Sequence, residues 1–493
     1  MTALPQALYR AAEVRELDRI AIHEMGIPGI TLMNRAGEAV WRQLQERWPR
    51  AHRIVVLCGT GNNGGDGFVV ARLAREAGRA VSVSVIGEES AIGGDARHAF
   101  EAMVDAGVRP RILDVPALEE ADVLVDALLG TGLDRPLAGA PGAAVTAING
   151  AGRPVIAVDV PTGLHADTGR VLGVAVRACH TVTFIGLKQG LFTATGPELT
   201  GTLSYDDLGI PAAVFARVPA AALRIVPAAL AAWLPPRPPG AHKGQFGHVL
   251  VVGGAPGMGG AARLAACAAA RSGAGLVSIA THPEHAHAGM VLQPELMCHG
   301  ISVAAELEPL LARATVVVVG PGLGRGAWAR SLLSRIWQAP QPLVVDADAL
   351  NALAAAPRRR TDWVLTPHPG EAARLLGSTA AAVQADRFAA VRALQAEYGG
   401  VAVLKGNGTV ICAGDGPLAL CDRGNPGMAS GGMGDVLSGL VGGLLAQGLA
   451  LSAAAQAGVY VHALAGDRAA GEQPRGMVAS DLLPEIRVGV NPR

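Results

Sequence analysis

Glycine-rich loops with polar side chains are the part of this sequence that could do chemistry, and the first is LCGTGNNGGDGFVVARLA at residues 57–74. Three of its glycines have the G-x-G-x-x-G spacing of a dinucleotide-binding turn between a strand and a helix: Gly59, Gly61 and Gly64. The dinucleotide motif does not include the polar residues of this loop, Asn62, Asn63 and Asp66. A carboxylate near a helix start also competes with a pyrophosphate for the helix N-terminus. The loop therefore predicts a site with chemistry of its own.

Three further polar clusters follow apolar runs in the first half of the chain, and they contain Asp126, Asp159 with Thr162, and Lys188. Ligands of an open parallel sheet bind beyond the carboxyl ends of its strands, so we expect these clusters to converge on the loop. A single strand-end Asp could simply cap a helix, and Lys188 could be a solvated charge, but four clusters at equivalent positions favour a site. Asp66, Asp159 and Lys188 are its candidate proton-transfer or substrate-orienting groups.

A cation site is also indicated in this half. Asn63, Asp126 and Thr162 offer an amide oxygen, a carboxylate and a hydroxyl. With one formal negative charge and no His or Cys, this set suits a monovalent cation better than zinc or calcium.

The second glycine-rich loop, GNPGMASGGMGDVLSGLVGG at residues 424–443, precedes a helix that Asp435 opens. Glycines free the backbone N–H groups ahead of that helix to cradle an anion. As a plain cap, Asp435 would stabilise the helix by about 1 kcal/mol. As a base it could take a proton from a substrate hydroxyl while the N–H groups hold a transferring phosphoryl group. Four more polar loops are expected at neighbouring strand ends: GPGLGRG (320–326), DADALN (346–351), TPHPGE (366–371) and KGNGT (405–409).

Two other motifs receive no function. The sequence has no Walker G-x-x-x-x-G-K-[ST], and HKGQFGH has the wrong order for Lys243 to be a P-loop lysine. THPEHAH holds His282, His285 and His287, whose spacing lacks the zincin pattern, so we assign these histidines no metal.

The elements that must position these loops alternate between strand and helix. Apolar runs in the first half predict buried parallel strands, with helical patterns such as 66–77 between them. The runs are 54–58, 80–86, 123–126, 155–159 and 182–185. In the second half we expect strands at 248–252, 275–280, 316–319, 343–346, 363–365, 401–405 and 410–412, and a helix at 261–272. The pattern predicts an α/β fold of two tandem domains, the first with a doubly wound parallel sheet.

A proline-rich break at residues 211–246 separates the halves, and we take residues 1–225 and 226–493 as the two domains.

An uncharged stretch at 436–466 is long enough to span a membrane. Its glycines and polar residues instead favour two buried helices joined near Gly448.

Composition limits the possible partners. The formal net charge is zero and basic residues form no long run, which argues against a nucleic-acid partner and favours small molecules. The N-terminus has no apolar signal segment, and the six cysteines show no C-x-x-C spacing. We therefore expect a cytoplasmic, homo-oligomeric protein with small-molecule ligands and no membrane partner.

Over residues 10–210 the sequence resembles the YjeF N-terminal family. The resemblance rests on RELDRIAIHEMGIPGITLMNRAGEAV, GTGNNGGDGFVVARLA, DALLGTGL, VDVPTGL and FIGLKQGL, which follow in that order. It implies a Rossmann-like epimerase that interconverts the two C6 epimers of hydrated NADH and NADPH, with a potassium ion on Asn63, Asp126 and Thr162. The residues that the resemblance places against the hydrated nucleotide are Asn62, Asn63, Gly64, Gly65, Asp66, Gly130, Thr131, Gly132, Leu133, Asp134, Arg135, Pro136 and Asp159.

From residue 240 the sequence resembles the ribokinase-like superfamily and, within it, the YjeF C-terminal family. G-x-G-D at residues 432–435 is similar to the superfamily's aspartate motif, and HKGQFGHVLVVGG, GPGLGRG, DADALN, TPHPGE, KGNGT and NPGMASGGMGDVLSG follow in the family's order. The resemblance implies a dehydratase for the S epimer of hydrated NAD(P)H that uses ADP or ATP with Mg²⁺. It places Gly322, His368 and Asp435 against the coenzyme. The residues it places against the adenine nucleotide are Lys405, Gly406, Asn407, Gly408, Thr409, Asn425, Pro426, Gly427, Met428, Ala429, Ser430 and Gly434.

The implied chemistry is coherent because hydroxide is a poor leaving group. Phosphorylation of the C6 hydroxyl, with Asp435 as base, followed by loss of phosphate would restore the dihydronicotinamide.

Two alternatives stay open. The second half could be a small-molecule kinase of the hydroxyethylthiazole or pyridoxine type, against which TPHPGE and the attached NNGGDG loop argue. The first half could be a nucleotide-binding or RNA-decapping scaffold, against which its intact polar residues argue.

Overall fold

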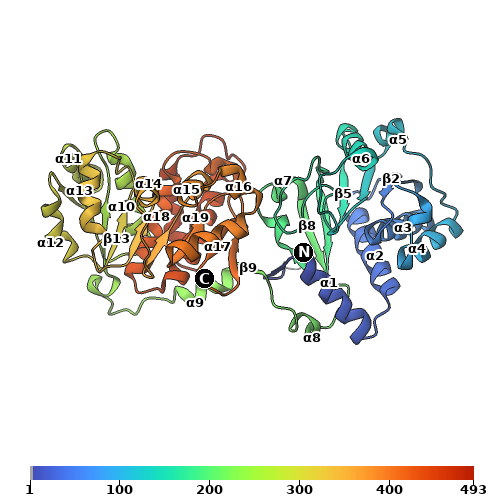
Figure 1. The fold of residues 1–493 in the computed structure, drawn as a ribbon, viewed down its shortest axis with the longest axis horizontal. Coiled ribbons are helices and arrows are strands. Elements are labelled where there is room, and N and C mark those ends of the chain that lie inside the picture. The colour runs from blue at the N-terminus through green and yellow to red at the C-terminus, as the bar shows by residue number, and fades with distance from the viewer. Residues whose placement is uncertain (1–3, 493) are drawn as a thin grey trace. The chain divides into compact units, whose positions relative to one another are not determined.

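The chain divides into two compact units, Met1–Leu223 and Arg224–Arg493, each with its own parallel sheet (Figure 1). The structure, a computed structural model, describes residues 4–492, except the side chains of residues 288–292.

The first unit is built on six parallel strands in the order β3-β2-β4-β5-β6-β8. Because the chain order reverses between β2 and β4, a switch point lies beyond the carboxyl ends of these strands, where ligands of such sheets bind. The strands are β2 (Arg53–Cys58), β3 (Ala80–Val85), β4 (Val123–Ala127), β5 (Val155–Val158), β6 (His180–Phe184) and β8 (Thr202–Asp206).

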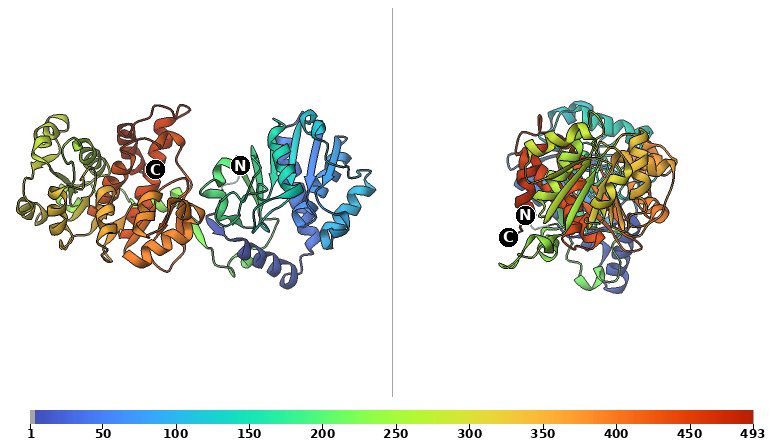
Figure 2. Two further views of the ribbon diagram at one scale, coloured as in Figure 1. Left: turned by 45° about the horizontal axis from the view of Figure 1, so that its top comes forward. Right: turned by 90° about the vertical axis from the view of Figure 1, so that its left-hand side faces the viewer.

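Helices cover both faces of this sheet, because alternate strand residues point to opposite sides. Val56 and Val125 belong to the larger hydrophobic cluster, shared with α1, α2, α3 and α4, whereas Val55 and Leu124 belong to a smaller one shared with α5 and α6. The ribbon shows helices on both sides of this sheet (Figure 2). The helices are α1 (Ala11–Arg19), α2 (Gly29–Arg47), α3 (Asn62–Glu76), α4 (Gly94–Asp105), α5 (Val115–Glu120), α6 (Gly139–Gly150), α7 (Gly196–Thr200) and α8 (Ala212–Phe215).

Three short strands pair outside the six-stranded sheet. β1 (Ala7–Tyr9) runs parallel to β7 (Leu187–Lys188) and antiparallel to β9 (Ala222–Arg224). The register places Tyr9 opposite Lys188. Since α1 follows β1 directly, this pairing brings the N-terminal helix to the segment that carries Lys188.

The second unit carries nine strands in the order β12-β11-β10-β13-β14-β15-β16-β17-β18. The pairs from β12 to β16 are parallel, and β17 and β18 extend the sheet as antiparallel strands. They are β10 (His248–Val252), β11 (Leu276–Thr281), β12 (Met297–Gly300), β13 (Val316–Val319), β14 (Leu343–Val345), β15 (Trp363–Leu365), β16 (Val401–Leu404), β17 (Thr409–Cys412) and β18 (Leu418–Cys421).

One face of the second sheet packs against α10, α18, α19 and α20 in a single hydrophobic cluster. The α10 and α18 backbones touch: a Cβ at Gly439 would lie 1.9 Å from the carbonyl oxygen of Ala265. Residues of α13 to α17 are outside this cluster, and the usual right-handed crossover between parallel strands is expected to place these helices on the other face. The helices are α9 (Pro227–Trp233), α10 (Gly259–Arg271), α11 (Pro283–Leu292), α12 (Glu308–Leu311), α13 (Ala327–Ile336), α14 (Ala347–Ala355), α15 (Pro369–Leu375), α16 (Ala380–Ala385), α17 (Arg387–Tyr398), α18 (Met433–Ala446), α19 (Leu451–Ala470) and α20 (Leu482–Gly489).

The predicted α/β fold is confirmed, and the predicted strands are found within about two residues of their expected bounds. The expected start of a helix at residue 66 is wrong by one turn, because α3 begins at Asn62. Gly64 explains the error: a Cβ there would lie 1.9 Å from the carbonyl oxygen of Gly59, so this glycine serves close packing inside a helix. The uncharged stretch forms α18 and α19, with Gly448 between them. Among residues 4–492 no helix combines the length and apolarity needed to cross a membrane.

Candidate active sites

A buried ion pair between Lys188 and Asp159 lies at the strand ends of the first unit. Asp159 follows β5 with a φ of 65°, and Lys188 lies in β7. The ammonium of Lys188 donates to Asp159, to the Phe184 carbonyl at 2.8 Å and to the Thr183 hydroxyl at 3.2 Å. Asp159 also accepts from the Thr183 hydroxyl at 3.1 Å and from the Phe184 N–H at 3.2 Å. The pair is thus fixed in position by the backbone and side chains of β6.

The loop before α3 meets this pair at Gly130. A Cβ at Gly130 would lie 3.1 Å from Asn63 Oδ1 and 3.5 Å from Asp159 Oδ2, so the two predicted loops and Asp159 converge there. Asp66 belongs to the same cluster: burial raises the pKa of this carboxyl well above its usual range, the nearby carboxylates of Asp159 and Asp18 raise it further, and Lys188 opposes them. The structure thereby brings together Asn63, Asp66, Gly130, Asp159 and Lys188.

Asp18 is a charged member of this cluster that the sequence reasoning missed. It lies on α1, half-buried. Burial raises its pKa to about 6, the Lys188 ammonium opposes that rise, and Asp159 adds to it. The available signal was its position four residues after Val14, which puts both side chains on the same face of the helix.

Asp126 and Thr162 meet directly beneath the first loop, and both are fully buried. The Thr162 hydroxyl donates to Asp126 at 2.7 Å and the Thr162 N–H at 2.8 Å. Burial raises the pKa of Asp126 to about 6, although the hydrogen bonds from Thr162 and Leu128 work against it. The side-chain amide nitrogen of Asn63 is also buried and has no hydrogen-bond partner. The oxygens of the carboxylate, the hydroxyl and the Asn63 amide are hard donors that fit a bound monovalent cation, whereas the amide nitrogen can only donate a hydrogen bond.

Lys405 is the centre of the second unit's polar cluster and follows β16. Its ammonium lies 2.8 Å from an Asp346 carboxylate oxygen and 3.9 Å from one of Glu371. A Cβ at Gly434 would lie 3.1 Å from Lys405 Nζ, so the ammonium faces the first turn of α18. Burial works to lower the pKa of Lys405, but the carboxylates of Asp346 and Glu371 outweigh it and raise the pKa.

Asp435 is the third residue of α18, as the predicted helix start requires, and the turn before the helix is left-handed at Gly432 with a φ of 90°. Burial raises the pKa of Asp435 to about 7, and the Asp346 carboxylate raises it while Lys405 opposes the rise. A carboxyl that ionises near neutral pH is suited to general-base catalysis.

His368 is the first residue of the turn that carries Glu371 into the cluster. The ring Nδ1 of His368 accepts from the Gly370 backbone N–H at 3.0 Å. The backbone N–H of His368 donates to the Glu371 carboxylate at 2.9 Å. Burial lowers the pKa of His368, and the positive charge of Lys405 lowers it further. Gly322 lies beyond β13, where its carbonyl accepts from Ala255 at 2.7 Å, so it belongs to the loop ahead of α10.

The loop at 425–430 is shaped by its own side chains. Asn425 Oδ1 accepts from the Gly427 N–H at 3.0 Å, and its amide donates to Asp467 at 3.2 Å. A Cβ at Gly427 would lie 2.2 Å from the Pro474 carbonyl oxygen, so a larger residue cannot replace it without a shift. The Ser430 hydroxyl is buried and has no hydrogen-bond partner, which leaves a donor for a ligand.

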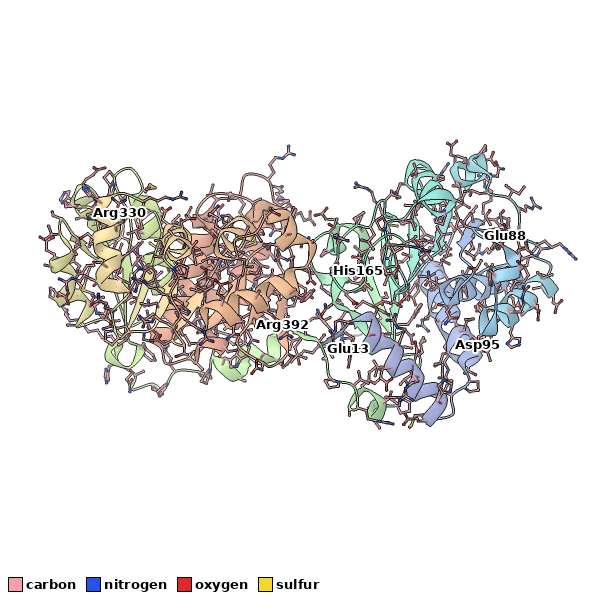
Figure 3. The ribbon with its side chains drawn as sticks, in the orientation of Figure 1. Glu13, Glu88, Asp95, His165, Arg330 and Arg392 are labelled. Atoms are coloured by element: carbon pink, nitrogen blue, oxygen red, sulfur yellow. The ribbon has the colours of Figure 1, made fainter. Side chains whose placement is uncertain are left out.

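The KGNGT loop is held from below by Arg387, the second group that sequence reasoning missed. This fully buried guanidinium donates to the carbonyls of Leu404, Lys405 and Gly408 at 3.1–3.3 Å and to Gln384 at 2.6 Å. Burial lowers its pKa to about 10. Arg392 lies on the same helix and is exposed (Figure 3). No pattern in the sequence distinguishes the two arginines.

The comparisons with known proteins cover both units. A family model described as "NAD(P)H-hydrate dehydratase" matches residues 249–487, and one described as "YjeF-related protein N-terminus" matches residues 29–190. The chain is 50% identical over 492 residues to the bifunctional NAD(P)H-hydrate repair enzyme of Coxiella burnetii, covering 98% of this chain and 99% of that protein. It belongs to the family of bifunctional NAD(P)H-hydrate repair enzymes. The Escherichia coli K12 repair enzyme is 42% identical over 493 residues, covering 99% of this chain and 95% of that protein.

A solved structure supports the ribokinase-like fold of this repair-enzyme family member. A ribokinase-like superfamily protein from Enterococcus faecalis V583 is 29% identical, with a TM-score of 0.51, and the match covers 54% of this chain and 94% of that chain. The family predicted for both halves of the sequence is thereby confirmed. A scaffold role for the first half, or an unrelated kinase in the second, does not agree with repair-enzyme relatives that match over the whole chain.

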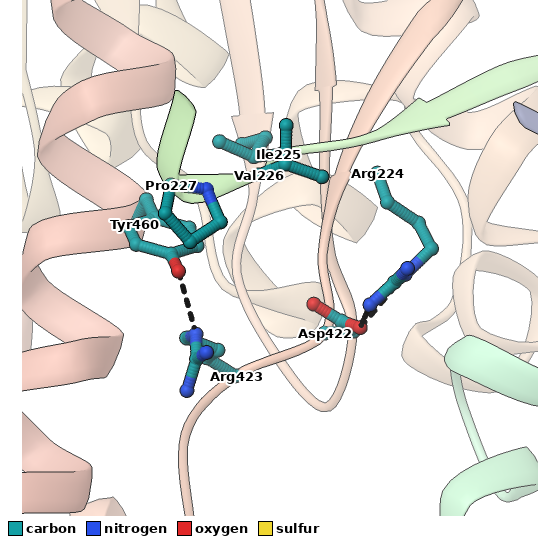
Figure 4. A pocket seen from close by; sticks show the side chains of 7 residues that line it. All are labelled: Arg224, Ile225, Val226, Pro227, Asp422, Arg423 and Tyr460. Carbon is teal, nitrogen blue, oxygen red and sulfur yellow. Dashed lines mark hydrogen bonds and ion pairs between the residues drawn. The ribbon is translucent and has the colours of Figure 1, made fainter. Parts of the chain in front are cut away.

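One cavity of the second unit is lined by none of the predicted site residues, although Arg423 in its wall lies two positions before Asn425 (Figure 4). Its charged groups are paired with one another or with polar neighbours: Arg224 binds Asp422 at 2.6 Å, and Arg423 binds the Tyr460 hydroxyl at 2.8 Å. We assign this cavity no part in the repair enzyme's chemistry.

Proposed function

We propose that this chain repairs hydrated NADH and NADPH in two steps. Residues 1–225 interconvert the R and S epimers at C6, and residues 226–493 remove water from the S epimer with ADP or ATP as phosphoryl donor. The observation that carries the proposal is that one chain, related to repair enzymes along its whole length, holds two separate polar clusters at strand ends, one around Lys188 and one around Lys405.

In the epimerase the two loops at 62–66 and 130–136 hold the hydrated nicotinamide nucleotide, together with Asp159. The convergence of Asn63, Gly130 and Asp159 supports this role. Lys188 fixes Asp159 by a buried ion pair, so Asp159 orients the substrate. Asp66, whose pKa is raised by burial, is the group in this loop that moves a proton.

Potassium fits the oxygen donors of Asn63, Asp126 and Thr162. The buried Asp126 carboxylate is hydrogen-bonded to Thr162 and has no cationic side chain among its hydrogen-bond partners in residues 4–492. When bound, the ion supplies positive charge beneath the substrate loop.

In the dehydratase the loops at 405–409 and 425–430, with Gly434, hold the adenine nucleotide. The carboxylates of Asp346 and Glu371 beside Lys405 fit a Mg²⁺ ion that arrives on the nucleotide phosphates, since Mg²⁺ usually takes one or two protein carboxylates. Gly322 and His368 hold the hydrated coenzyme, with its C6 hydroxyl at Asp435.

Dehydration then proceeds in two balanced steps. Asp435 takes the proton of the C6 hydroxyl, whose oxygen bonds to the terminal phosphorus as the bond to the donor nucleotide breaks. Phosphate leaves with the electrons of the C6–O bond, and loss of a proton from C5 forms the C5=C6 double bond of the dihydronicotinamide. Lys405 and the backbone N–H groups at the start of α18 stabilise the charge on the phosphoryl oxygens.

The test is an absorbance assay of dihydronicotinamide recovery from mixed R and S hydrated NADH, with potassium, magnesium and either ADP or ATP. We expect complete recovery with one nucleotide and none without it. Accumulation of a stable phosphorylated product would instead identify a kinase. The homo-oligomeric state and the cytoplasmic location stay predictions, which light scattering and fractionation would check.

A further inference from the structure

Helix α1 lies directly on the segment that carries Lys188. Tyr9 pairs with Lys188 in the β1–β7 register. At Gly186 a Cβ would lie 2.8 Å from the Tyr9 ring and 3.0 Å from a Val14 methyl group, so this glycine lets α1 approach the backbone. The N–H of Ala11 donates to Asp167 at 2.6 Å and fixes the start of the helix.

Asp18 lies one helical turn beyond Val14 on the same face of α1. Leu17 beside it is fully buried, whereas Glu16 and Arg19 pair with each other at 2.7 Å on the exposed face. The charged neighbours of Asp18 are Lys188 and Asp159, and Asp18 in turn acts on Asp66. Two carboxyl groups, one from α1 and one from α3, are therefore influenced by the charges of the same ion pair.

Charge neutralisation does not account for Asp18. An ammonium group has three N–H donors. Those of Lys188 are directed to Asp159, the Thr183 hydroxyl and the Phe184 carbonyl. Lys188 is thus paired without Asp18, and a half-buried carboxyl next to an ion pair that is already complete needs another reason for its position.

We propose that Asp18 is a catalytic residue of epimerisation, which exchanges protons with the C6 oxygen as the counterpart of Asp66. The proposal rests on the epimerase function proposed above and adds a residue to it. The raised pKa values of both carboxyls support it, because a carboxyl that ionises nearer neutral pH can serve as acid in one direction and base in the other.

The proton balance needs only water. One carboxyl in its acid form protonates the C6 hydroxyl, the C6–O bond breaks, water leaves, and the N1 lone pair forms an N1=C6 double bond. Water then adds to the opposite face of C6, the π electrons return to N1, and the second group, as carboxylate, takes the proton of the incoming water. The net result is inversion at C6 and transfer of one proton between the carboxyls, and the reverse reaction exchanges their roles.

The first experiment uses the full chain with Asp18→Asn, and Glu16→Gln on the exposed face of the same helix as the matched control. We expect Asp18→Asn to lower kcat for R-epimer conversion by about 10²- to 10⁴-fold with KM unchanged, and Asp18→Glu to recover part of the rate. Dehydration of pure S epimer by the same preparations stays at the wild-type rate. A rate for Asp18→Asn within twofold of wild type, or a change in KM alone, would overturn the proposal.

A second experiment needs no variant. Epimerisation by the wild-type chain in ¹⁸O-labelled water, without nucleotide, should place label at C6 in each inverted molecule, as mass spectrometry can detect. Inversion without label would overturn the proposal, since C6–O cleavage would not occur. If the wild-type chain does not invert the R epimer at all, the proposed epimerase function fails, which is distinguishable from either result above.

Discussion

Each of the two units places a lysine among carboxylates at the ends of parallel strands, but Lys188 is fully buried while Lys405 is partly exposed, and their surroundings differ. Lys188 directs its three donors to Asp159 and two oxygens of β6. Lys405 has one carboxylate at 2.8 Å and a second at 3.9 Å, and it faces the glycine-rich start of α18. Within the described residues, the first lysine is saturated while the second keeps donors for an anion.

This difference separates two kinds of chemistry. Around Lys188 the carboxyls that remain, Asp66 and Asp18, are the proposed proton carriers, and the lysine has no N–H donor left for an anion. Around Lys405 a base, Asp435, lies next to backbone N–H groups that can hold phosphate. The first site therefore suits proton transfer alone, and the second suits phosphoryl transfer to a hydroxyl.

We expect the largest effect of a single substitution at Asp435, because it should remove one activity and leave the other unchanged. Asp435→Asn keeps the shape of the side chain but removes the base, so we expect dehydration of the S epimer to fall by about 10²- to 10⁴-fold while R/S epimerisation is unchanged. Absorbance and chromatographic assays on one preparation measure both rates. Asp415→Asn, in an exposed loop, is the control and should leave both rates unchanged. Undiminished dehydration by Asp435→Asn would remove it from the role of base.

Lys188→Met tests the lysine whose three N–H donors all have hydrogen-bond partners. It leaves the Asp159 carboxylate without its cation, which typically costs about 3–5 kcal/mol of unfolding free energy when a buried pair is broken. We expect that loss in denaturant titrations, together with about a hundredfold loss of epimerisation, the effect of displacing a substrate-orienting group such as Asp159. Arg53→Met, which removes an exposed pair with Glu120 at 3.4 Å, should change stability by about 0–1 kcal/mol. Equal effects of the two changes would contradict the importance of burial.

Arg387→Met tests the support of the nucleotide loop. Its hydrogen bonds to the carbonyls of Leu404, Lys405 and Gly408 would be lost, so we expect KM for the nucleotide to rise about tenfold, roughly the effect of one charged hydrogen bond. Arg387→Lys should have a KM for the nucleotide between those of wild type and Arg387→Met, because an ammonium cannot make the same set of hydrogen bonds as the planar guanidinium. Arg392→Met is the matched control on the same helix. A rise in KM shared by both methionine variants would argue against a specific role for Arg387.

The smallest expected effect is a pH dependence set by Asp435. A base must be ionised, so kcat/KM for dehydration should rise with pH through about 7, the pKa to which burial raises this carboxyl. Because the folded-state pKa lies above the unfolded value, the protonated carboxyl favours folding at low pH and this contribution is lost as pH rises through 7. Asp435→Asn should therefore be stabilised relative to wild type more at pH 8 than at pH 5, as thermal melts would show. The reverse order would contradict the assigned pKa.

The sequence predicted the parts of the fold that depend on continuous apolar runs. Buried parallel strands have such runs, so the ends of β4 and β5 that carry Asp126 and Asp159 were placed correctly, whereas Lys188 lies in the short strand β7, which was not predicted. Two edge strands were missed: β8 (TLSYD) is half-buried and alternates polar with apolar residues, and β12 (MCHG) has no continuous apolar run, so neither has a strong apolar pattern. The start of α3 was misplaced because close packing, not helix propensity, selects its glycines.

One physical reason explains why Asp18 and Arg387 were not predicted from the sequence. Asp18 and Arg387 are charged residues in helices, where charge ordinarily indicates a solvated face. Arg387 is buried because four acceptors from the loop and α16 surround it, and Asp18 is drawn inward by the pairing of β1 with β7. Such contacts join segments far apart in the chain or depend on backbone carbonyls, which one sequence does not reveal.

The most direct test of two independent sites in one chain is a mixing experiment with pure R-hydrated NADH and nucleotide. Asp435→Asn alone should give R/S mixtures and no NADH, and Lys188→Met alone should leave the R epimer largely unchanged. A mixture of the two variants should recover NADH completely, because the S epimer released by one is the substrate of the other. No recovery by the mixture, with each variant active at its remaining site, would contradict the account.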